Sequence, residues 1–174
     1  MKIVLLGYMA SGKSIIAKML SEKIDLKYID LDLYIEKKEG KIISKIFKTN
    51  GEIYFRLLEN ACLLELLLSN ENFILSVGGG TPCYANNMEL INKHAQSIFL
   101  KASINTIYTR IIVEKEKRPL IAAIENNRLK EFIAKHLFER NIFYELANYH
   151  LKVDDLSVDE IIENIVIQLD DKIN

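Results

Sequence analysis

The sequence lacks several features that would assign it to particular classes of protein. No apolar run approaches the ~20 residues that a membrane-spanning helix needs, and the richest stretch, ACLLELLLS, is interrupted by Glu65. The early run KIVLL is shorter than a signal-peptide core. Neither sign of charge predominates, because 23 Lys and Arg residues face 24 Asp and Glu residues. General binders of nucleic acid or anionic membranes are usually basic, so we expect neither partner and a cytoplasmic location.

Cysteine, histidine and proline are also scarce. Cys62 and Cys83 lack the spacing of a metal site, and we interpret both as core or near-core residues. His94, His136 and His150 are scattered, which predicts neither a metal cluster nor a catalytic dyad. Two prolines and no Pro/Gly/Ser-rich stretch leave no evident linker. The 174 residues therefore predict one domain that spans the whole chain.

Short apolar runs alternate with longer amphipathic ones along the chain. Strands are predicted at 2–6, 27–31, 73–77, 97–101 and 149–153. Helices are predicted at about 13–23, 52–69, 86–94, 104–116, 127–146 and 158–169, the last beginning with a capping box of Ser157 and Glu160. Near-continuous apolar strands are typical of parallel sheets covered on both faces. The pattern therefore predicts an α/β fold, a three-layer α/β/α sandwich around a five-stranded parallel sheet.

The segment GYMASGKS, residues 7–14, lies between the first predicted strand and the first predicted helix. It matches G-x-x-x-x-G-K-[ST] in the context that this motif requires. Small residues allow backbone N–H groups to wrap a polyphosphate, and the following helix points its positive end at the same ligand. Lys13 would then reach the β- and γ-phosphates, and Ser14 would bind Mg²⁺. The alternative is an ordinary glycine-rich turn.

Two carboxylates follow in YIDLD, residues 28–32. Residues two apart on a strand point to the same side, so we expect Asp30 and Asp32 to face one site from the strand end. The third strand, FILSV, leads into glycine and lacks the usual Walker B acid, which makes Asp30 the candidate for the Mg²⁺ shell. Asp32 would accept a substrate hydroxyl proton. Solvated acids at a strand end are the alternative.

Further polar segments follow along the chain. In FRLLE, Arg56 and Glu59 stand one helical turn apart, either as a surface ion pair or as an arginine braced to grip a carboxylate. The glycines of VGGGTP suit a loop that passes close to a ligand, or an ordinary tight turn. EKEKRPLI indicates a lid at about 112–125 that carries Arg118, or a solvated linker. Arg140 alone is an unremarkable helix-surface arginine.

Together and in this order, these segments resemble the shikimate kinase family over about residues 1–155. Members of that family transfer the γ-phosphoryl group of ATP to the 3-hydroxyl of shikimate with Mg²⁺, in aromatic amino-acid biosynthesis. Their fold is that of the nucleoside monophosphate kinases. The resemblance therefore implies a sheet of P-loop NTPase type with strand order 2-3-1-4-5, and we expect a monomer whose ligands are shikimate and ATP.

The resemblance also implies a role for each matching residue. Catalysis falls to Lys13, Asp32 and Arg118. The nucleotide is bound by Gly7, Ala10, Ser11, Gly12, Lys13, Ser14, Ile15, Arg110, Arg118 and Asp154, with Arg110 and Asp154 beside the adenine. Shikimate is bound by Asp32, Arg56, Gly78, Gly79, Gly80 and Arg140, largely from a region at about 32–60, and Glu59 braces Arg56. The metal is held by Ser14 and by Asp30 through water.

Two positions depart from the family's usual loop. Ala10 stands where a further glycine is common, and Ile15 stands where threonine is common. Because Ala10 carries a Cβ, we expect it to keep a negative φ. With Lys13 and Ser14 intact, we expect the loop to function.

Two other functions remain open from the residues alone. Another small P-loop kinase, for gluconate or a nucleoside monophosphate, would also need Lys13 and Ser14. A nucleotide acceptor should need base-reading groups. The sequence instead offers Arg56 and Arg140 as a carboxylate clamp, together with hydrogen-bond acceptors for a polyol. A non-catalytic nucleotide sensor is the second alternative, against which the intact Lys13, Ser14, Asp32 and Arg118 argue.

Overall fold

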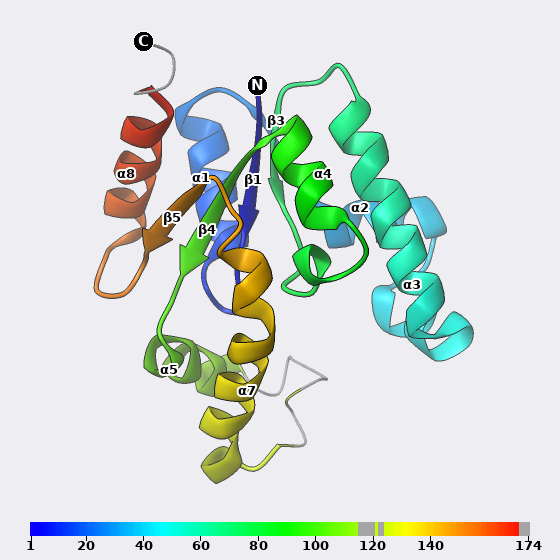
Figure 1. Ribbon diagram of the computed structural model, residues 1–174, viewed down its shortest axis with the longest axis vertical. Coiled ribbons are helices and arrows are strands. Elements are labelled where there is room, and N and C mark those ends of the chain that lie inside the picture. Colours follow the sequence, from blue (N-terminus) through cyan, green and yellow to red (C-terminus); the bar gives the residue numbers. More distant parts are fainter. Residues whose placement is uncertain (115–120, 122–123, 171–174) are drawn as a thin grey trace.

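The computed structural model describes residues 1–114, 121 and 124–170. Its strands form one parallel sheet in the order β2-β3-β1-β4-β5, which confirms both the predicted fold class and the predicted strand order (Figure 1). The strands are β1 (Lys2–Leu6), β2 (Lys27–Asp30), β3 (Phe73–Ser76), β4 (Gln96–Lys101) and β5 (Tyr149–Lys152).

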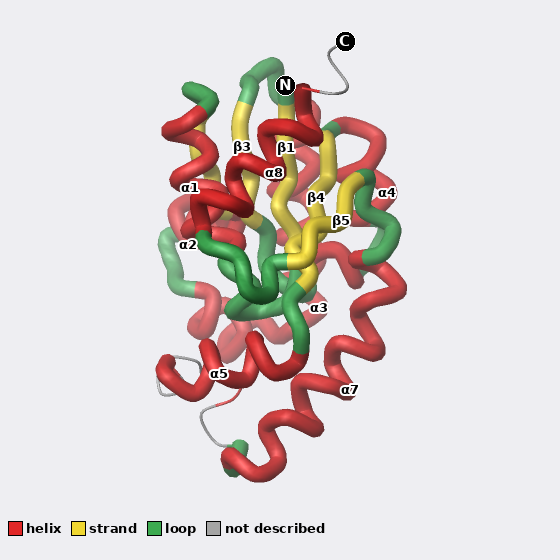
Figure 2. The backbone as a smooth tube through the Cα atoms, turned by 90° about the vertical axis from the view of Figure 1, so that its left-hand side faces the viewer, coloured by secondary structure: helices red, strands yellow, loops and turns green. Residues whose placement is uncertain are grey.

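Helices cover both faces of the sheet (Figures 1 and 2). They are α1 (Lys13–Lys23), α2 (Leu31–Glu39), α3 (Ile43–Leu68), α4 (Asn87–His94), α5 (Ile104–Glu114), α7 (Asn126–Tyr144) and α8 (Val158–Asp170), with a short 3₁₀ helix η1 (Thr81–Cys83). None of the described helices is long and apolar enough to cross a membrane.

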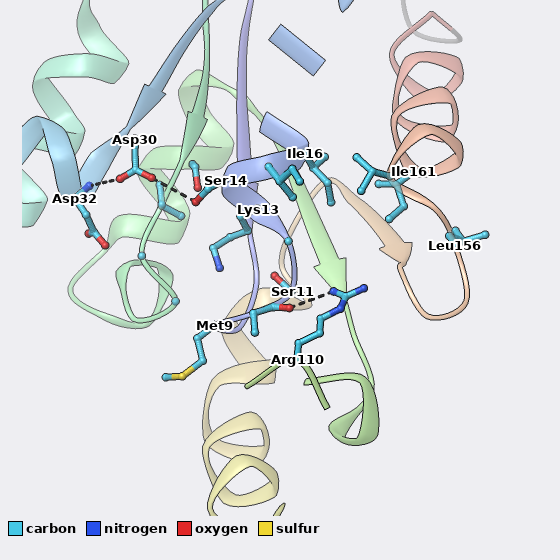
Figure 3. A pocket seen from close by; sticks show the side chains of 18 of the residues that line it. Met9, Ser11, Lys13, Ser14, Ile16, Asp30, Asp32, Arg110, Leu156 and Ile161 are labelled. Carbon is cyan, nitrogen blue, oxygen red and sulfur yellow. Dashed lines mark hydrogen bonds between the residues drawn. The ribbon is translucent and has the colours of Figure 1, made fainter. Parts of the chain in front are cut away.

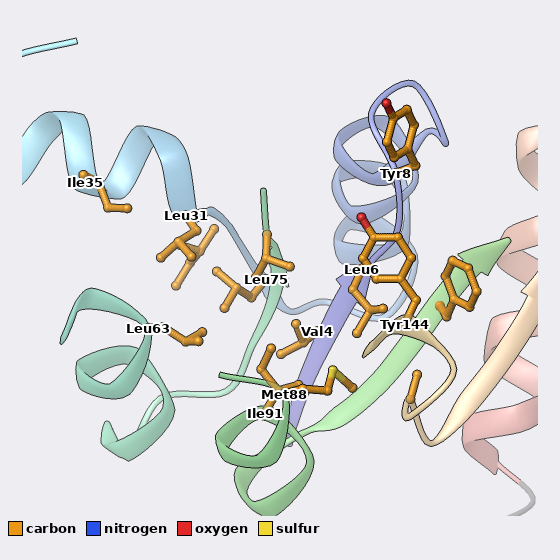
Figure 4. Packing of buried hydrophobic residues seen from close by; sticks show 14 of the residues in the cluster. Val4, Leu6, Tyr8, Leu31, Ile35, Leu63, Leu75, Met88, Ile91 and Tyr144 are labelled. Atoms are coloured by element: carbon orange, nitrogen blue, oxygen red, sulfur yellow. The ribbon is translucent and has the colours of Figure 1, made fainter. Parts of the chain in front are cut away.

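The central strand β1 shows why the sheet needs two covering layers. Its residues from Ile3 to Leu6 are buried, and successive side chains enter opposite halves of the core. Ile3 and Leu5 pack with residues of α1 and α8. Val4 and Leu6 pack with residues of α3, α4 and α7, as the cluster in Figure 4 shows. This burial on both faces is the reason that the strand reads as a continuous apolar run.

Parallel pairing brings the carboxyl ends of the strands to one edge of the sheet. In the register of β2 with β3, Asp30 lies opposite Ser76, and in that of β1 with β3, Leu5 lies opposite Ser76. Ligands of open parallel sheets bind at this edge. The segments that leave β1, β2 and β3 there are the glycine-rich loop, the start of α2 and the three-glycine turn.

One helix was absent from the sequence-based prediction, and it changes the geometry of the two aspartates. Strand β2 ends at Asp30, and α2 begins at Leu31. The Asp30 carboxylate caps α2, because its Oδ1 accepts hydrogen bonds from the backbone N–H groups of Asp32 at 3.0 Å and Leu33 at 3.2 Å. The prediction that Asp30 and Asp32 share the face of a strand is therefore wrong, since Asp32 lies in the first turn of a helix.

Helix α3 is also longer than predicted. It begins at Ile43 and is interrupted at Gly51, whose φ of 83° and ψ of 172° are not helical. The predicted helix at 52–69 corresponds to the part that follows this kink. That part carries both Arg56 and Glu59, so their spacing of one helical turn is as predicted.

Two smaller predictions are confirmed. Ser157 and Glu160 form the capping box of α8: Glu160 Oε2 accepts from the Ser157 N–H at 2.8 Å, and Ser157 Oγ accepts from the Glu160 N–H at 3.3 Å. Cys62 is fully buried in the core.

Candidate active site

The glycine-rich loop between β1 and α1 has a conformation that depends on two glycines. Gly7 has a φ of 145°, and a Cβ on it would lie 2.8 Å from the carbonyl oxygen of Leu100. Gly12, with a φ of 102°, is the N-cap of α1. Larger residues would strain the backbone at both places. The loop therefore turns sharply and opens onto the N-terminus of α1, where the helix dipole favours an anion.

Ala10 contradicts the expectation of a negative φ, because its φ is 60°. This left-handed conformation costs a residue with a Cβ roughly 1–2 kcal/mol, which the surrounding loop must offset. Two hydrogen bonds fix the chain there: the Ser11 N–H donates to the Tyr8 carbonyl at 3.2 Å, and Arg110 Nη1 donates to the Ala10 carbonyl at 3.1 Å. Loop closure thus prevails over the intrinsic preference of alanine.

Lys13 is the first residue of α1, and its ammonium lies inside the curve of the loop. Its Nζ donates to the carbonyl oxygens of Gly7 and Tyr8, both at 2.9 Å. The side chain is held in a buried position, with 9% of the residue exposed. A buried ammonium at the positive end of a helix is well placed to neutralise a phosphate group that enters the loop.

A hydroxyl and a carboxylate lie next to each other beside this loop (Figure 3). Ser14 Oγ is 3.5 Å from Asp30 Oδ2, which also accepts a hydrogen bond from the Tyr28 hydroxyl at 3.2 Å. Ser76, at the end of β3 and opposite Asp30, is buried and carries no carboxylate. Asp30 therefore places a carboxylate oxygen beside the loop hydroxyl.

These oxygens fit a magnesium ion. Mg²⁺ usually takes one or two protein oxygens and completes its shell with water and phosphate. The described part of the chain contains no cluster of three or more His, Cys, Asp and Glu side chains that could hold a metal by itself. A hydroxyl and a carboxylate beside a phosphate loop match the sparse donor set of Mg²⁺ with a nucleotide, and no richer site competes among these residues.

Asp32 is a second carboxylate with unusual electrostatics. Burial, the largest cause, and the negative charges of Asp30 and Glu59 together raise its pKa from 3.8 to about 6, while Lys13 opposes the shift. Asp32 therefore binds a proton more tightly than an ordinary aspartate does. Such a carboxylate suits a hydroxyl that must be oriented or deprotonated near neutral pH.

The three-glycine turn after β3 is where the polar side chains converge. A Cβ on Gly78 would lie 3.3 Å from Asp32 Oδ1, and a Cβ on Gly80 would lie 3.0 Å from Arg56 Nη2. Larger residues would crowd these side chains. The turn thus brings together an aspartate from α2 and an arginine from α3.

The third glycine of this turn, Gly79, brings in a residue from much later in the chain. A Cβ on Gly79 would lie 3.6 Å from Arg140 Nη1 and 3.3 Å from the Gly7 carbonyl oxygen. The Tyr144 hydroxyl, from the end of α7, donates a hydrogen bond to the Gly79 carbonyl. Arg140, unremarkable in the sequence, therefore lies against the same turn as Arg56 does.

Arg56 is held by its neighbours in one orientation. Its Nη1 donates to Glu59 Oε2 at 2.8 Å, and Glu59 is only 1% exposed. The second Glu59 oxygen accepts from Thr81 Oγ1 at 2.6 Å, so both oxygens of this buried carboxylate are hydrogen-bonded. The Arg56 guanidinium also lies 3.9 Å from the ring centroid of Tyr84, and Glu52 Oε1 is 3.4 Å from its Nη2.

A cleft of about 820 Å³ joins the glycine-rich loop to Asp32 and to the glycine turn. It is lined by the loop residues from Met9 to Ile16, by Asp30, Asp32, Ser76, Val77, Gly78, Gly79, Arg110, Val113, Leu156, Val158 and Ile161. The volume suits a cofactor-sized ligand. The cleft contains most of the residues predicted for the nucleotide.

Three apolar lining residues of this cleft, Leu156, Val158 and Ile161, were not predicted from the sequence. Their signal was their position in the segment after the last strand and in the first turn of α8, at the edge where ligands bind. Asp154, which was predicted instead, has its Oδ1 bonded to the Ser103 N–H at 2.9 Å and to the Thr106 hydroxyl, at the start of α5. Its contact with adenine stays a prediction.

Arg118 and most of the predicted lid lie outside the described residues. Of the remaining site residues, the structure brings Lys13, Ser14, Asp30 and Asp32 to one cleft and places Arg56 and Arg140 on the glycine turn beside it.

Comparison with known proteins gives an assignment that agrees with this geometry. The family model described as shikimate kinase matches residues 9–170. The chain belongs to the shikimate kinase family. The shikimate kinase of Flavobacterium johnsoniae is 51% identical over 166 residues, which cover 95% of this chain and 96% of that protein.

Solved structures of shikimate kinases have the same fold. That from Bacteroides thetaiotaomicron has a TM-score of 0.91 and 32% identity, and the match covers 97% of this chain and 98% of that one. That from Acinetobacter baumannii, in complex with shikimate, has a TM-score of 0.87 and 27% identity, with coverage of 99% and 95%. The family resemblance inferred from the motifs is therefore confirmed, and as a shikimate kinase family member the chain is an ATP-dependent kinase.

The electrostatics of Asp32 give a testable titration. Its carboxyl group should lose its proton with a midpoint near pH 6, because burial and nearby carboxylates favour the protonated form. Carboxyl ¹³C NMR of the aspartate-labelled protein measures this, and the Asp32→Asn spectrum identifies the resonance. An ordinary midpoint, at about pH 4, would contradict the described environment.

Proposed function

We propose that this member of the shikimate kinase family transfers the γ-phosphoryl group of ATP to the 3-hydroxyl of shikimate. The products are shikimate 3-phosphate and ADP, on the route to chorismate and the aromatic amino acids. The observation that supports this most is the convergence of Arg56, Arg140 and Asp32 on one glycine turn beside the phosphate loop. Shikimate carries one carboxylate and three hydroxyls, which match two arginines and an aspartate.

The nucleotide site would work mainly through charge. The backbone of the loop and the N-terminus of α1 would hold the β- and γ-phosphates, and Lys13 would neutralise the group in transfer. Arg110, bonded to the Ala10 carbonyl at the cleft wall, and the apolar residues Leu156 and Ile161 would flank the base. Arg118 would close from the lid onto the phosphates.

Magnesium would be held by Ser14 directly and by Asp30 through water. When bound, the ion supplies charge neutralisation between the β- and γ-phosphates. The protein's own contribution is the fixed orientation of Asp30: one carboxylate oxygen caps α2, and the other faces Ser14.

The acceptor would be oriented through its carboxylate at one end and its hydroxyl groups at the other. Arg56 and Arg140 would bind the shikimate carboxylate by charge-assisted hydrogen bonds, and Asp32 would bind the hydroxyl groups. At neutral pH most Asp32 side chains are ionised, since the pKa of Asp32 is about 6. Asp32 would accept the proton of the attacking hydroxyl as its oxygen approaches the γ-phosphorus. Positioning and charge neutralisation then supply most of the rate enhancement.

The direct test is ATP consumption with shikimate, compared with gluconate and with nucleoside monophosphates. Shikimate should be phosphorylated fastest, and Lys13→Ala should abolish transfer while circular dichroism shows an intact fold. The matched control is Lys18→Ala, an exposed lysine on the same helix. Near-normal turnover by Lys13→Ala, or preference for another acceptor, would overturn the proposal.

The carboxylate clamp gives a second prediction. Arg56→Ala or Arg140→Ala should weaken shikimate binding by ~2–5 kcal/mol, since each removes a charge-assisted partner of the carboxylate. Affinity for ATP alone should change little. Isothermal titration calorimetry measures both, with Arg128→Ala, an exposed arginine on α7, as the control. Normal shikimate binding in both clamp variants would mean that the acceptor carboxylate does not bind at these arginines.

The two aspartates should differ in their response to metal. Asp30→Asn keeps an oxygen that can cap α2 but loses the charge, so it should raise the Mg²⁺ requirement and be partly rescued by more metal. Asp32→Asn should lower kcat by about 10²-fold or more without rescue, because an amide cannot accept the proton. A Mg²⁺ titration of both variants at saturating ATP and shikimate measures this difference. Rescue of Asp32→Asn alone would mean that Asp32 holds the metal and Asp30 accepts the proton.

A further inference from the structure

Tyr8, the second residue of the glycine-rich loop, lies between the nucleotide site and the carboxylate clamp. Its backbone carbonyl accepts from Lys13 Nζ at 2.9 Å and from the Ser11 N–H at 3.2 Å, so its main chain belongs to the phosphate loop. Its side chain is only 1% exposed and is part of the core cluster drawn in Figure 4. The main chain and the side chain of this residue therefore serve different parts of the molecule.

The side chain of Tyr8 contacts helix α7. The Tyr8 hydroxyl is 3.2 Å from His136 Nδ1, and the two rings meet edge to face at a centroid distance of 6.3 Å. The His136 ring also contacts Phe132, at 4.0 Å between centroids. The Arg140 guanidinium carbon lies 5.6 Å from the Tyr8 ring centroid. Since residues four apart share a helix face, His136 and Arg140 both meet the same tyrosine.

The two clamp arginines are supported differently. Arg56 is braced by the buried carboxylate of Glu59 at 2.8 Å. Within residues 1–114, 121 and 124–170, Arg140 has no salt bridge of this kind; its neighbours there include the Tyr8 ring, the Tyr144 hydroxyl and Gly79. An aromatic face attracts a guanidinium, most strongly where water is excluded, and the Tyr8 ring is buried. The ring can therefore do for Arg140 part of what Glu59 does for Arg56.

We propose that Tyr8 is a positioning residue that holds Arg140 in place for the substrate carboxylate and aligns the clamp with the phosphate loop. This inference rests on the proposed shikimate kinase activity. The contact of the ring with Arg140 is the operative one, and core packing holds the ring in place. An aliphatic side chain would fill the same volume without attracting the guanidinium.

The test compares Tyr8→Leu with Tyr8→Phe in steady-state kinetics. Tyr8→Leu should raise the KM for shikimate by about 3- to 30-fold, the range of a lost cation–π contact. The KM for ATP should stay within about twofold, because any residue supplies the carbonyl that Lys13 contacts. Tyr8→Phe keeps the ring and should stay close to the wild type. Equal increases in the two KM values for Tyr8→Leu would indicate a general structural defect and overturn the proposal.

A double variant shows whether Tyr8 acts through Arg140. In the Arg140→Ala background, Tyr8→Leu should cause no further increase in the shikimate KM, since the group that the ring holds is already absent. A further increase of the same size as in the wild type would mean that Tyr8 acts by another route. Wild-type protein that does not phosphorylate shikimate would refute the proposed function itself, a separate outcome.

Where Tyr8→Leu does not fold, a fluorinated series keeps the proposal testable. Phenylalanine, monofluoro- and trifluorophenylalanine at position 8 retain the shape of the ring while fluorination weakens its attraction for a cation. The shikimate KM should rise stepwise along this series and the ATP KM should not. A flat series for shikimate would overturn the cation–π contact as the basis of positioning.

Discussion

The close packing around the turn of Gly78, Gly79 and Gly80 is the constraint on which the arrangement of this site depends. A Cβ on any of the three would come within 3.3 Å of an atom of another residue. These contacts involve Asp32 from α2, Arg56 from α3, and the loop after β1, and Arg140 from α7 lies just beyond them. Elements far apart in the chain therefore meet at one turn, and they can do so because the turn has no side chains.

The burial of charge at this turn explains why so many polar contacts surround it. Glu59 is almost completely buried, and its two oxygens accept from Arg56 and Thr81. Removing one partner of such a carboxylate leaves an uncompensated charge, so the network holds Arg56 in one orientation. For Asp32, burial and the charges of Asp30 and Glu59 outweigh the opposing charge of Lys13, so its pKa rises. We therefore propose that Glu59 serves to position Arg56 and that Asp32 serves proton transfer.

Some of this could be read from the sequence, for physical reasons. A buried parallel strand must be apolar on both faces, so runs such as KIVLL predicted the sheet, and the P-loop spacing identified the loop before α1. The strand order came from the family resemblance. Helix α2 was missed although Asp30 and Gly40 stand at its two ends, a readable pair of caps. Because it was missed, the aspartates were assigned to a strand.

Other features depend on tertiary contacts that no local pattern encodes. The positive φ of Ala10 arises in a loop closed by two hydrogen bonds, one of them from Arg110, a hundred residues later. Arg140 comes close to the glycine turn because α7 packs against that turn. Tyr8 has no sequence signal that separates it from an ordinary core residue. Its proposed role depends on its contact with Arg140.

Above all, we propose that Arg56 and Arg140, which lie against the glycine turn, recognise a carboxylate. The most direct measurement compares the dissociation constants of shikimate and its uncharged methyl ester for the wild-type protein and for Arg56→Ala. The wild type should bind the ester at least about tenfold more weakly than the acid, since the ester cannot form the charge-assisted pairs. Arg56→Ala should discriminate much less between the two ligands. Equal affinity of the wild type for acid and ester would show that the arginines do not recognise the carboxylate.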